Sequence, residues 1–380
     1  MRRLMAGTTL LLSTVSIAAA PVVTVPVGTA ANTPSSTAAA AAPAAPVRAA
    51  AEEWRRIGLP FLWPNAGLSD IAAVGPADVW VAGAQGAFCI PQIASWGCYV
   101  RSDGNPVVRH WNGSAWEEFP LPGWNSHGAI TSIGTVASDD VWVSTPPHVQ
   151  PAYLAHFDGT AFTKIDPPES DVPVEVHGGA AGAWLSTTGG DAPLYRWTDG
   201  AWQPAQGTGL TRVEDVRART ATDAWAVGEA AGNRAAAAHW DGDSWTPVDY
   251  PGDDRRLTEV LPVSATEVWA AVYAAEYVVR WNGSTWSQID LPSGTQWVDL
   301  AVDGSGTVWA GGLERIYVDG YGKWRPVLLS YTGGTWQRTT LSMPWGADEM
   351  TVNGLTAVPV TGALWLAATA SNGPVVLTND

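Results

Sequence analysis

Hydrophobic and polar residues alternate through a short unit that recurs along the chain. In its clearest copy, residues 279–292, the alternation runs up to Trp281 and resumes after a tight turn at Trp286. The turn contains Asn282 and Gly283, two residues that tolerate a positive φ. A period of two on both sides of an Asn-Gly pair is typical of a β-hairpin. The unit therefore predicts two antiparallel strands with one aromatic residue on each side of a turn.

Five further copies keep the two aromatic residues five positions apart: Trp111 and Trp116, Phe157 and Phe162, Trp197 and Trp202, Trp240 and Trp245, Tyr331 and Trp336. A second aromatic marker recurs ahead of the hairpins, usually after a short polar or acidic turn and a β-rich run: Trp80, Trp142, Trp184, Trp225, Trp269, Trp309 and Trp365. Each repeat thus predicts four antiparallel strands. Recurrence at about 40 to 50 residues is the signature of propeller blades.

The two kinds of marker differ in number, which indicates how the ring closes. There are seven of the Trp80 type but six complete hairpins, and the chain ends within residues 373–380, where a seventh hairpin would turn. Residues 53–60 match the strand that begins at Trp116. We therefore predict an all-β, seven-bladed propeller of four-stranded antiparallel blades, closed by an amino-terminal strand (about 52–60) that completes the last blade. Such closure hides open strand edges.

The residues before the propeller have a different composition. Arg2 and Arg3 precede an apolar run that extends to Ala20, with small-residue cleavage sites after Ala20 or Ala31, which predicts a secretory signal over 1–31. A retained membrane anchor is the alternative, but the run is short and has no charged flank on its far side. Residues 32–51 are rich in Ala and Pro and predict a disordered linker, followed by the propeller over 52–380. We therefore expect a secreted, extracellular protein whose mature form does not insert into membranes.

Two insertions fall between the second and third strands of their blades, at residues 84–105 and 312–325. The first contains the only two cysteines, Cys89 and Cys98. In an exported chain, a close pair of this kind predicts a local disulfide. Two free thiols are the alternative; a zinc site is disfavoured because zinc usually takes four ligands and no His is near in sequence.

Tryptophan is unusually frequent, with 23 residues, and the repeat accounts for most of them as core positions. Six remain, all in the insertions or in the connections between blades: Trp63, Trp96, Trp124, Trp297, Trp324 and Trp345. Because these segments emerge at the same end of each blade, we expect one aromatic face, concentrated on neighbouring blades.

Flat aromatic rings beside polar groups suit carbohydrate, which presents both an apolar C–H face and hydroxyls. The predicted ligand-binding residues are Trp63, Trp96, Trp124, His127, Tyr321, Trp324, Arg325 and Trp345. Exposed aromatic residues equally suit a protein interface. For Trp63, Trp124 and Trp345 there is a further alternative, since each follows a hairpin-type Trp by eight or nine residues and could be one more repeat position that packs between blades.

Catalytic and metal-binding patterns are missing from the sequence. There is no Gly-x-Ser-x-Gly, no His-Glu-x-x-His and no phosphate-binding glycine loop. His110, His156 and His239 occupy the same position of the repeat. The acidic residues are interpreted as dispersed along the chain. For those in turns, a solvated turn is favoured over a calcium site. The net charge of -16 argues against nucleic acid and anionic membranes. We predict no catalytic residue, no cofactor and no metal.

The repeat resembles the kelch and galactose-oxidase-type propellers. The resemblance lies in Val308–Gly312 with Tyr331 and Trp336, and in Trp111, Trp116 and the Leu121–Pro122 pair. Turns such as residues 241–245 also resemble degenerate Asp-box hairpins. The resemblance implies the propeller fold, but the oxidase's copper site of Tyr, His and Tyr-linked Cys has no counterpart here.

Taken together, the sequence predicts a secreted, monomeric, noncatalytic protein that binds a glycan or cell-envelope polysaccharide. An extracellular protein interaction scaffold is the alternative, and a propeller glycosidase or lyase is the third candidate. A glycan site should place exposed Trp beside Asp or Arg in separate shallow pockets. A docking site should show a contiguous apolar patch, and an enzyme should show carboxylates converging in the central channel.

Overall fold

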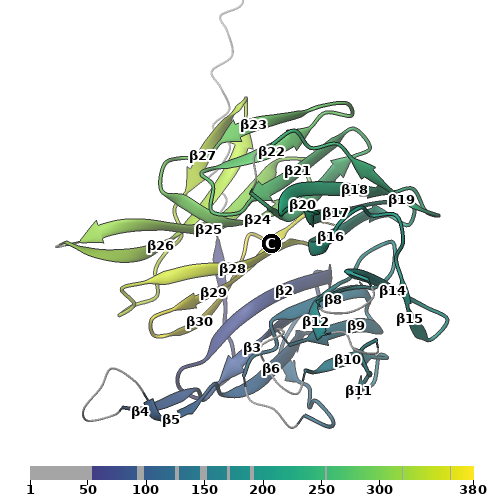
Figure 1. Ribbon diagram of the computed structural model, residues 1–380. Helices are drawn as coiled ribbons and strands as arrows, with labels where there is room; N and C mark the ends of the chain where they lie inside the picture. The colour runs from purple at the N-terminus through teal and green to yellow at the C-terminus, as the bar shows by residue number, and fades with distance from the viewer. Residues whose placement is uncertain are drawn as a thin grey trace, which may run out of the picture. The chain divides into compact units, whose positions relative to one another are not determined.

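The computed structural model describes residues 54–91, 98–124, 128–145, 152–168, 172–188, 192–252, 255–318, 320–359 and 361–380. Over these ranges the chain is all-β, with no helix. Seven four-stranded antiparallel sheets form the blades of a propeller, and a two-stranded hairpin lies within the first blade's insertion (Figure 1). The fold class predicted from the sequence is confirmed.

The blades follow one another along the chain, and each is listed from its innermost strand outward. Blade one is β2 Gly67–Gly75, β3 Asp78–Gln85, β6 Asn105–Trp111 and β7 Trp116–Glu118; blade two is β8 Ser132–Ala137, β9 Asp140–Ser144, β10 Leu154–Phe157 and β11 Phe162–Lys164; blade three is β12 Val172–His177, β13 Trp184–Thr188, β14 Leu194–Thr198 and β15 Ala201–Pro204. Blade four is β16 Arg212–Thr220, β17 Asp223–Ala230, β18 Arg234–Trp240 and β19 Trp245–Val248; blade five is β20 Leu257–Ser264, β21 Glu267–Val272, β22 Tyr277–Trp281 and β23 Trp286–Asp290. Blade six is β24 Thr295–Val302, β25 Val308–Val318, β26 Tyr321–Thr332 and β27 Thr335–Thr339; blade seven is β28 Met350–Ala357, β29 Leu364–Ala370, β30 Gly373–Thr378 and β1 Arg55–Ile57.

The predicted ring closure is confirmed by the outermost strand of blade seven. Strand β1 pairs antiparallel with β30, with Arg55 opposite Thr378 and Ile57 opposite Val376. Ile57 is buried, and it packs in the same core cluster as Val376 and Trp365. The amino-terminal strand therefore covers an edge of the last blade that would otherwise be open.

The two recurring aromatic markers meet across the boundary between neighbouring blades. The ring of Trp142 in blade two lies 4.8 Å from that of Trp197 and 4.9 Å from that of Trp202, both in blade three. The same contact recurs between the other blades, and Trp54 supplies it for Trp309 of blade six. Each aromatic side chain buries about 150–250 Å². The five-residue spacing is thus explained by packing between blades.

The acidic residue that precedes the marker Trp in five of the seven blades also has a structural use. In blade one, the Asp78 carboxylate accepts a hydrogen bond from Trp80 Nε1 (2.9 Å) and contacts His110 Nε2 (2.8 Å), whose ring stacks on Trp80. Blade two repeats the arrangement with Asp140, Trp142 and His156. The histidines therefore belong to the repeat, as the sequence indicated.

The hairpin turns differ from the tight two-residue form that the sequence predicts. Only blades three and six have it, at Asp199–Gly200 and Gly333–Gly334, where both residues take a positive φ. The other hairpins described use four residues, and only their glycine has a positive φ. In these turns the Asn or Asp side chain accepts hydrogen bonds from the backbone, as Asn282 does from Ser284 N and Thr285 N. Asp241 does the same, which accounts for this acidic turn without calcium.

Both insertions are β-hairpins. Strands β4 (Phe88–Pro91) and β5 (Cys98–Ser102) pair within the first, so Cys89 and Cys98 lie on adjacent strands. The side chain of Cys98 lies outside the described part, and the disulfide stays a prediction. In blade six, β25 and β26 continue without interruption through the insertion and pair as far as Val318 and Tyr321. This long hairpin projects from the blade (Figure 1).

Candidate binding face and the central channel

Large hydrophobic side chains that are strongly exposed gather in one sector. In the described part of the chain they are Phe61, Trp63, Phe88, Ile90, Tyr317 and Trp345, which we call the exposed rim. Each lies in a connection between blades or in an insertion between a second and a third strand. In an antiparallel four-stranded blade these two kinds of segment emerge at the same end. The exposed rim therefore lies on one face, over blades six, seven and one.

Two tryptophans of the exposed rim are held by hydrogen bonds of their loops. Trp345 is 97% exposed, and its carbonyl oxygen accepts a hydrogen bond from Asn372 Nδ2 (2.8 Å). Trp63 is 62% exposed, and its backbone N–H donates a hydrogen bond to Oε1 of the buried Gln85 side chain (3.0 Å). Their rings are thus presented to solvent from a hydrogen-bonded backbone, which reduces the loop-ordering entropy that is lost on binding.

A groove of about 710 Å³ lies beside Trp63. One wall is formed by residues 59–67, between β1 and β2, and the other by residues 369–374, around the β29–β30 turn. Asn65 and Ser371 contribute polar side chains, as does Asn372, which also holds the Trp345 loop. The groove therefore combines an exposed indole with amide and hydroxyl groups.

Trp124 has a different environment from Trp63 and Trp345, although all three follow a hairpin-type Trp by eight or nine residues. Its ring packs edge to face on Tyr153 (5.0 Å) and joins the core between blades one and two. The interpretation as a packing position between blades therefore fits Trp124. It does not fit Trp63 or Trp345, which are exposed.

The other predicted site residues lie in the insertions or outside the described part of the chain. Trp324 is half-buried on the β25–β26 hairpin, where the Arg315 guanidinium lies 5.8 Å from its ring, and Arg325 follows it. The side chain of Tyr321 lies outside the described part, as do Trp96 and His127 entirely.

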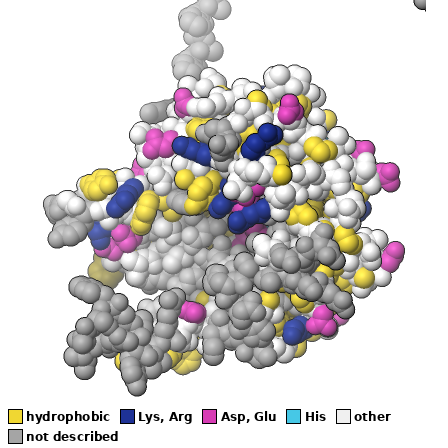
Figure 2. Space-filling model, in the orientation of Figure 1, with side chains coloured by type: hydrophobic (Ala, Val, Ile, Leu, Met, Phe, Trp, Pro, Cys, Tyr) yellow, Lys and Arg dark blue, Asp and Glu magenta, His cyan; other side chains and the backbone are white. Residues whose placement is uncertain are grey.

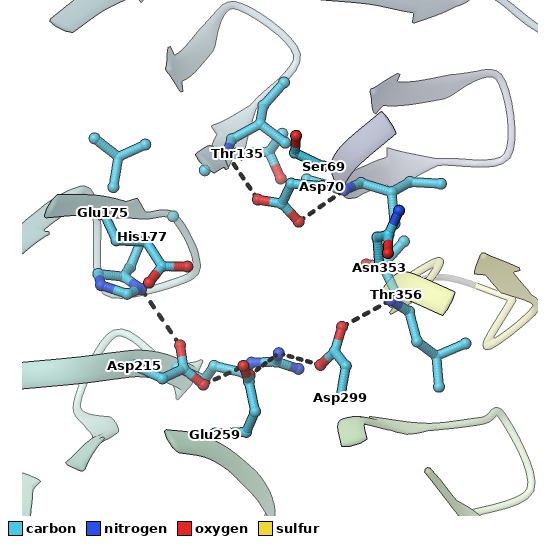
Figure 3. A pocket seen from close by; sticks show the side chains of 18 of the residues that line it. Ser69, Asp70, Thr135, Glu175, His177, Asp215, Glu259, Asp299, Asn353 and Thr356 are labelled. Carbon is cyan, nitrogen blue, oxygen red and sulfur yellow. Dashed lines mark hydrogen bonds and ion pairs between the residues drawn. The ribbon is translucent and has the colours of Figure 1, made fainter. Parts of the chain in front are cut away.

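The central channel contains charged residues that sequence reasoning missed. Five carboxylate side chains line a cavity of about 360 Å³, and Figure 3 shows them converging from different blades: Asp70, Glu175, Asp215, Glu259 and Asp299. All five occupy the same repeat position, directly after a β-bulge in the innermost strand. The interpretation of the acidic residues as dispersed was therefore wrong. Their signal is a constant spacing, nine or ten residues before the marker Trp of the same blade.

The three aspartates bond the innermost strands of neighbouring blades together. Asp70 accepts a hydrogen bond from Ile133 N in blade two (2.8 Å). Asp299 accepts one from Leu355 N in blade seven (2.7 Å), and Asp215 accepts one from Val260 N in blade five (2.9 Å). Because the innermost strand of each blade has no partner strand on its channel side, these carboxylates satisfy backbone donors that would otherwise be unpaired.

Arg217 supplies a positive charge among the carboxyl groups in one half of the channel. Its guanidinium contacts Asp299 (2.7 Å), Glu259 (2.9 Å) and Asp215 (3.1 Å), and so joins blades four, five and six. Burial acts to raise the pKa of Asp215, but Arg217 and His177 outweigh it, and the pKa falls to about 2. This half of the channel is therefore held as a compact ionic network.

In the part of the chain that the structure describes, the other half of the channel has no such cation. Burial raises the pKa of Asp70 to about 7, despite the lowering effect of the backbone amides of Ile133 and Ile71. The pKa of Glu175 is well above its usual range because of burial and then the nearby charges of Asp215 and Asp70. Within the described residues, the Glu175 carboxylate has no hydrogen-bond partner. Asp70 therefore exchanges its proton near neutral pH, and Glu175 holds its proton more strongly than an ordinary glutamate does.

The described residues contain no group of three or more His, Cys, Asp or Glu side chains placed to hold a metal ion. No helix that is long and apolar enough to cross a membrane occurs among them.

Comparison with known proteins identifies the fold and no family. No protein-family model matches the chain, and no curated protein matches it. Among solved structures, Ycf48 bound to a D1 peptide is 17% identical (TM-score 0.54; 85% of this chain and 94% of that chain). Virginiamycin B lyase from Staphylococcus aureus is 12% identical (TM-score 0.57; 86% and 98%), and a streptogramin B lyase is 13% identical (TM-score 0.55; 86% and 97%). At these identities the likeness shows a β-propeller and nothing finer. The resemblance to kelch and Asp-box repeats stays a prediction.

Proposed function

We propose that this protein is a noncatalytic, secreted binding protein that recognises a glycan through the exposed rim, with its main site in the groove beside Trp63. The observation that carries the proposal is the presence of two anchored, exposed indoles, Trp63 and Trp345, on one face. In the repeat, tryptophan is otherwise used for packing between blades. An indole left in water forgoes roughly 4 to 6 kcal/mol of burial, so a ligand that covers it gains that surface.

The composition of the groove favours a sugar over a wholly apolar ligand. Trp63 offers a flat ring for the C–H face of a sugar, and Asn65, Ser371 and Asn372 offer donors and acceptors for its hydroxyls. A groove with a few convergent polar groups beside an aromatic ring is the usual arrangement of a small-ligand site.

A protein partner is the second candidate, supported by the extent of the exposed rim. Its six apolar residues extend over three blades, which is more than one sugar covers. Ycf48, bound to a D1 peptide, provides an analogy at the level of the fold alone. A lyase or glycosidase is third: carboxylates do converge in the channel, but three of them are hydrogen-bonded between blades.

The proposal is tested by calorimetric titration of the protein with a panel of polysaccharides and peptidoglycan fragments. We expect saturable binding to at least one glycan, weakened at least tenfold by W63A combined with W345A. The control is W63F combined with W345F, which keeps aromatic rings and should bind more tightly than the alanine pair. If no glycan in the panel binds, the glycan proposal is wrong, and a protein partner becomes the favoured ligand of the exposed rim.

A further inference from the structure

The projecting β25–β26 hairpin carries a cation and aromatic rings on one of its faces. Arg315 and Tyr317 are two residues apart on β25, so their side chains lie on the same side. Their cross-strand partners on β26 are Trp324 and Gly322, respectively. Figure 2 shows basic and hydrophobic side chains gathered on this hairpin. We call Arg315, Tyr317 and Trp324 the hairpin triad.

The guanidinium of Arg315 lies among the aromatic rings of the hairpin triad. Its Cζ is 5.5 Å from the centre of the Tyr317 ring and 5.8 Å from that of the Trp324 ring, both within cation–π range. Gly322 makes this position possible, because a Cβ at residue 322 would lie 2.6 Å from Arg315 Nε. The glycine therefore leaves the space that the guanidinium occupies.

Arg315 has no anionic partner among the described residues, in contrast to Arg338 and Lys323 nearby. Arg338 forms a two-pronged ion pair with Glu314 (2.7 and 2.9 Å), and Lys323 pairs with Asp348 (2.7 Å). Arg315 is exposed, yet the chain has 36 acidic residues against 20 basic ones. A guanidinium with five donors, and with no carboxylate partner among the described residues, is thus exposed on this hairpin.

We propose that the hairpin triad binds the carboxylate of an acidic polysaccharide, a polymer of uronic acid residues. The inference rests on the proposed function and specifies its ligand class. The planar guanidinium matches a carboxylate in two-pronged geometry, and the aromatic rings hold it in place before binding. Tyr317, which is 70% exposed, supplies a ring for the C–H face of the same sugar.

The test compares alginate, a polyuronate, with dextran, a neutral glucan, in titrations of the full-length protein. The variant R315Q should weaken alginate binding at least tenfold and leave any dextran binding unchanged. R56Q removes the same charge from an exposed position on β1, in the outer strand of blade seven, and should leave alginate binding within about twofold. R315K should recover only part of the loss, because Lys does not form the planar pair.

The outcomes separate this inference from the proposed function. If dextran or another neutral glycan binds in a Trp63-dependent manner and alginate does not, the inference is overturned and the proposed function stands. If R315Q and R56Q weaken alginate binding equally, the loss is explained by the change in net charge alone, and the inference is overturned. Binding of poly-glutamate, sulfate or phosphate with the same dependence on Arg315, in place of alginate, would overturn the assignment to uronate.

Discussion

The central channel contains converging carboxyl groups and the exposed rim contains aromatic rings, and the two regions differ in how these side chains are partnered. In the channel, Asp70, Asp215 and Asp299 accept hydrogen bonds from the next blade, and Arg217 contacts three carboxylates. On the exposed rim, Trp63 and Trp345 present their rings to solvent. The channel aspartates are bonded to a neighbouring blade, whereas the rings of Trp63 and Trp345 are left exposed. We infer that side chains with a partner in a neighbouring blade hold the ring together, while exposed side chains without such a partner are available for binding.

The variant R217M, which alters the channel, should cause the largest loss in the free energy of unfolding. Removing the guanidinium leaves Asp215, Glu259 and Asp299 close together without a cation. Losing one partner of a buried ionic network costs about 3 to 5 kcal/mol, and we expect the lower end because Arg217 is 30% exposed. Urea unfolding at pH 7 measures the loss, with R56M as the control for a lost positive charge. A loss below about 1 kcal/mol would mean that the network does not stabilise the ring.

The next largest change in the free energy of unfolding should distinguish Trp124 from Trp345, although both follow a hairpin-type Trp by eight or nine residues. W124A removes a ring packed on Tyr153 and should lower the free energy of unfolding by about 2 to 3 kcal/mol. W345A removes a ring that contacts mainly solvent and should change it by less than about 0.5 kcal/mol. Thermal and urea denaturation of both variants check the difference. Equal destabilisation by both would contradict the division between packing and exposed positions.

A smaller effect follows from the pKa of Asp70, which is about 7 in the folded protein. Between the ordinary carboxyl pKa and about 7, the folded state binds more protons than the unfolded state, so stability falls as pH rises through this window. Glu175 acts in the same direction. Asp215 acts in the opposite direction, but only at acid pH, because its stabilisation is lost as pH falls towards about 2.

We therefore expect the free energy of unfolding to decrease between pH 5 and pH 8, and D70N to make the decrease smaller by about 2 kcal/mol. Urea unfolding at a series of pH values measures both slopes. The control is D243N, which removes a carboxylate from an exposed hairpin turn and should leave the slope unchanged. A slope in D70N equal to that of the wild type would show that Asp70 does not titrate in this window.

The sequence predicted the blades and their closure because both depend on short repeated patterns. The marker Trp residues and the hairpin aromatics pack in every blade, so each copy reinforces the same inference. The channel was missed because its carboxylates are some 40 residues apart and converge only when the ring closes. The β-bulge that places Glu175 and Asp215 has no strong local signature in composition.

The candidate site was only partly accessible from the sequence. Trp63, Trp124 and Trp345 have nearly the same offset from a hairpin-type Trp, yet one of them packs and two do not. The difference depends on a partner supplied by another blade, which for Trp124 is Tyr153. Likewise, the hairpin triad depends on the register that puts Gly322 opposite Tyr317, which no pattern in the sequence predicts.

The dissociation constant for the best-bound polysaccharide, measured for wild type and for W63A combined with W345A, tests the central claim most directly. We predict that the double variant binds at least tenfold more weakly, which corresponds to about 1.4 kcal/mol or more, while its melting temperature stays within about 2 °C of the wild type. An unchanged dissociation constant in the double variant would contradict the account. So would binding that is lost in D70N while the double variant keeps it, because the ligand would then lie in the channel.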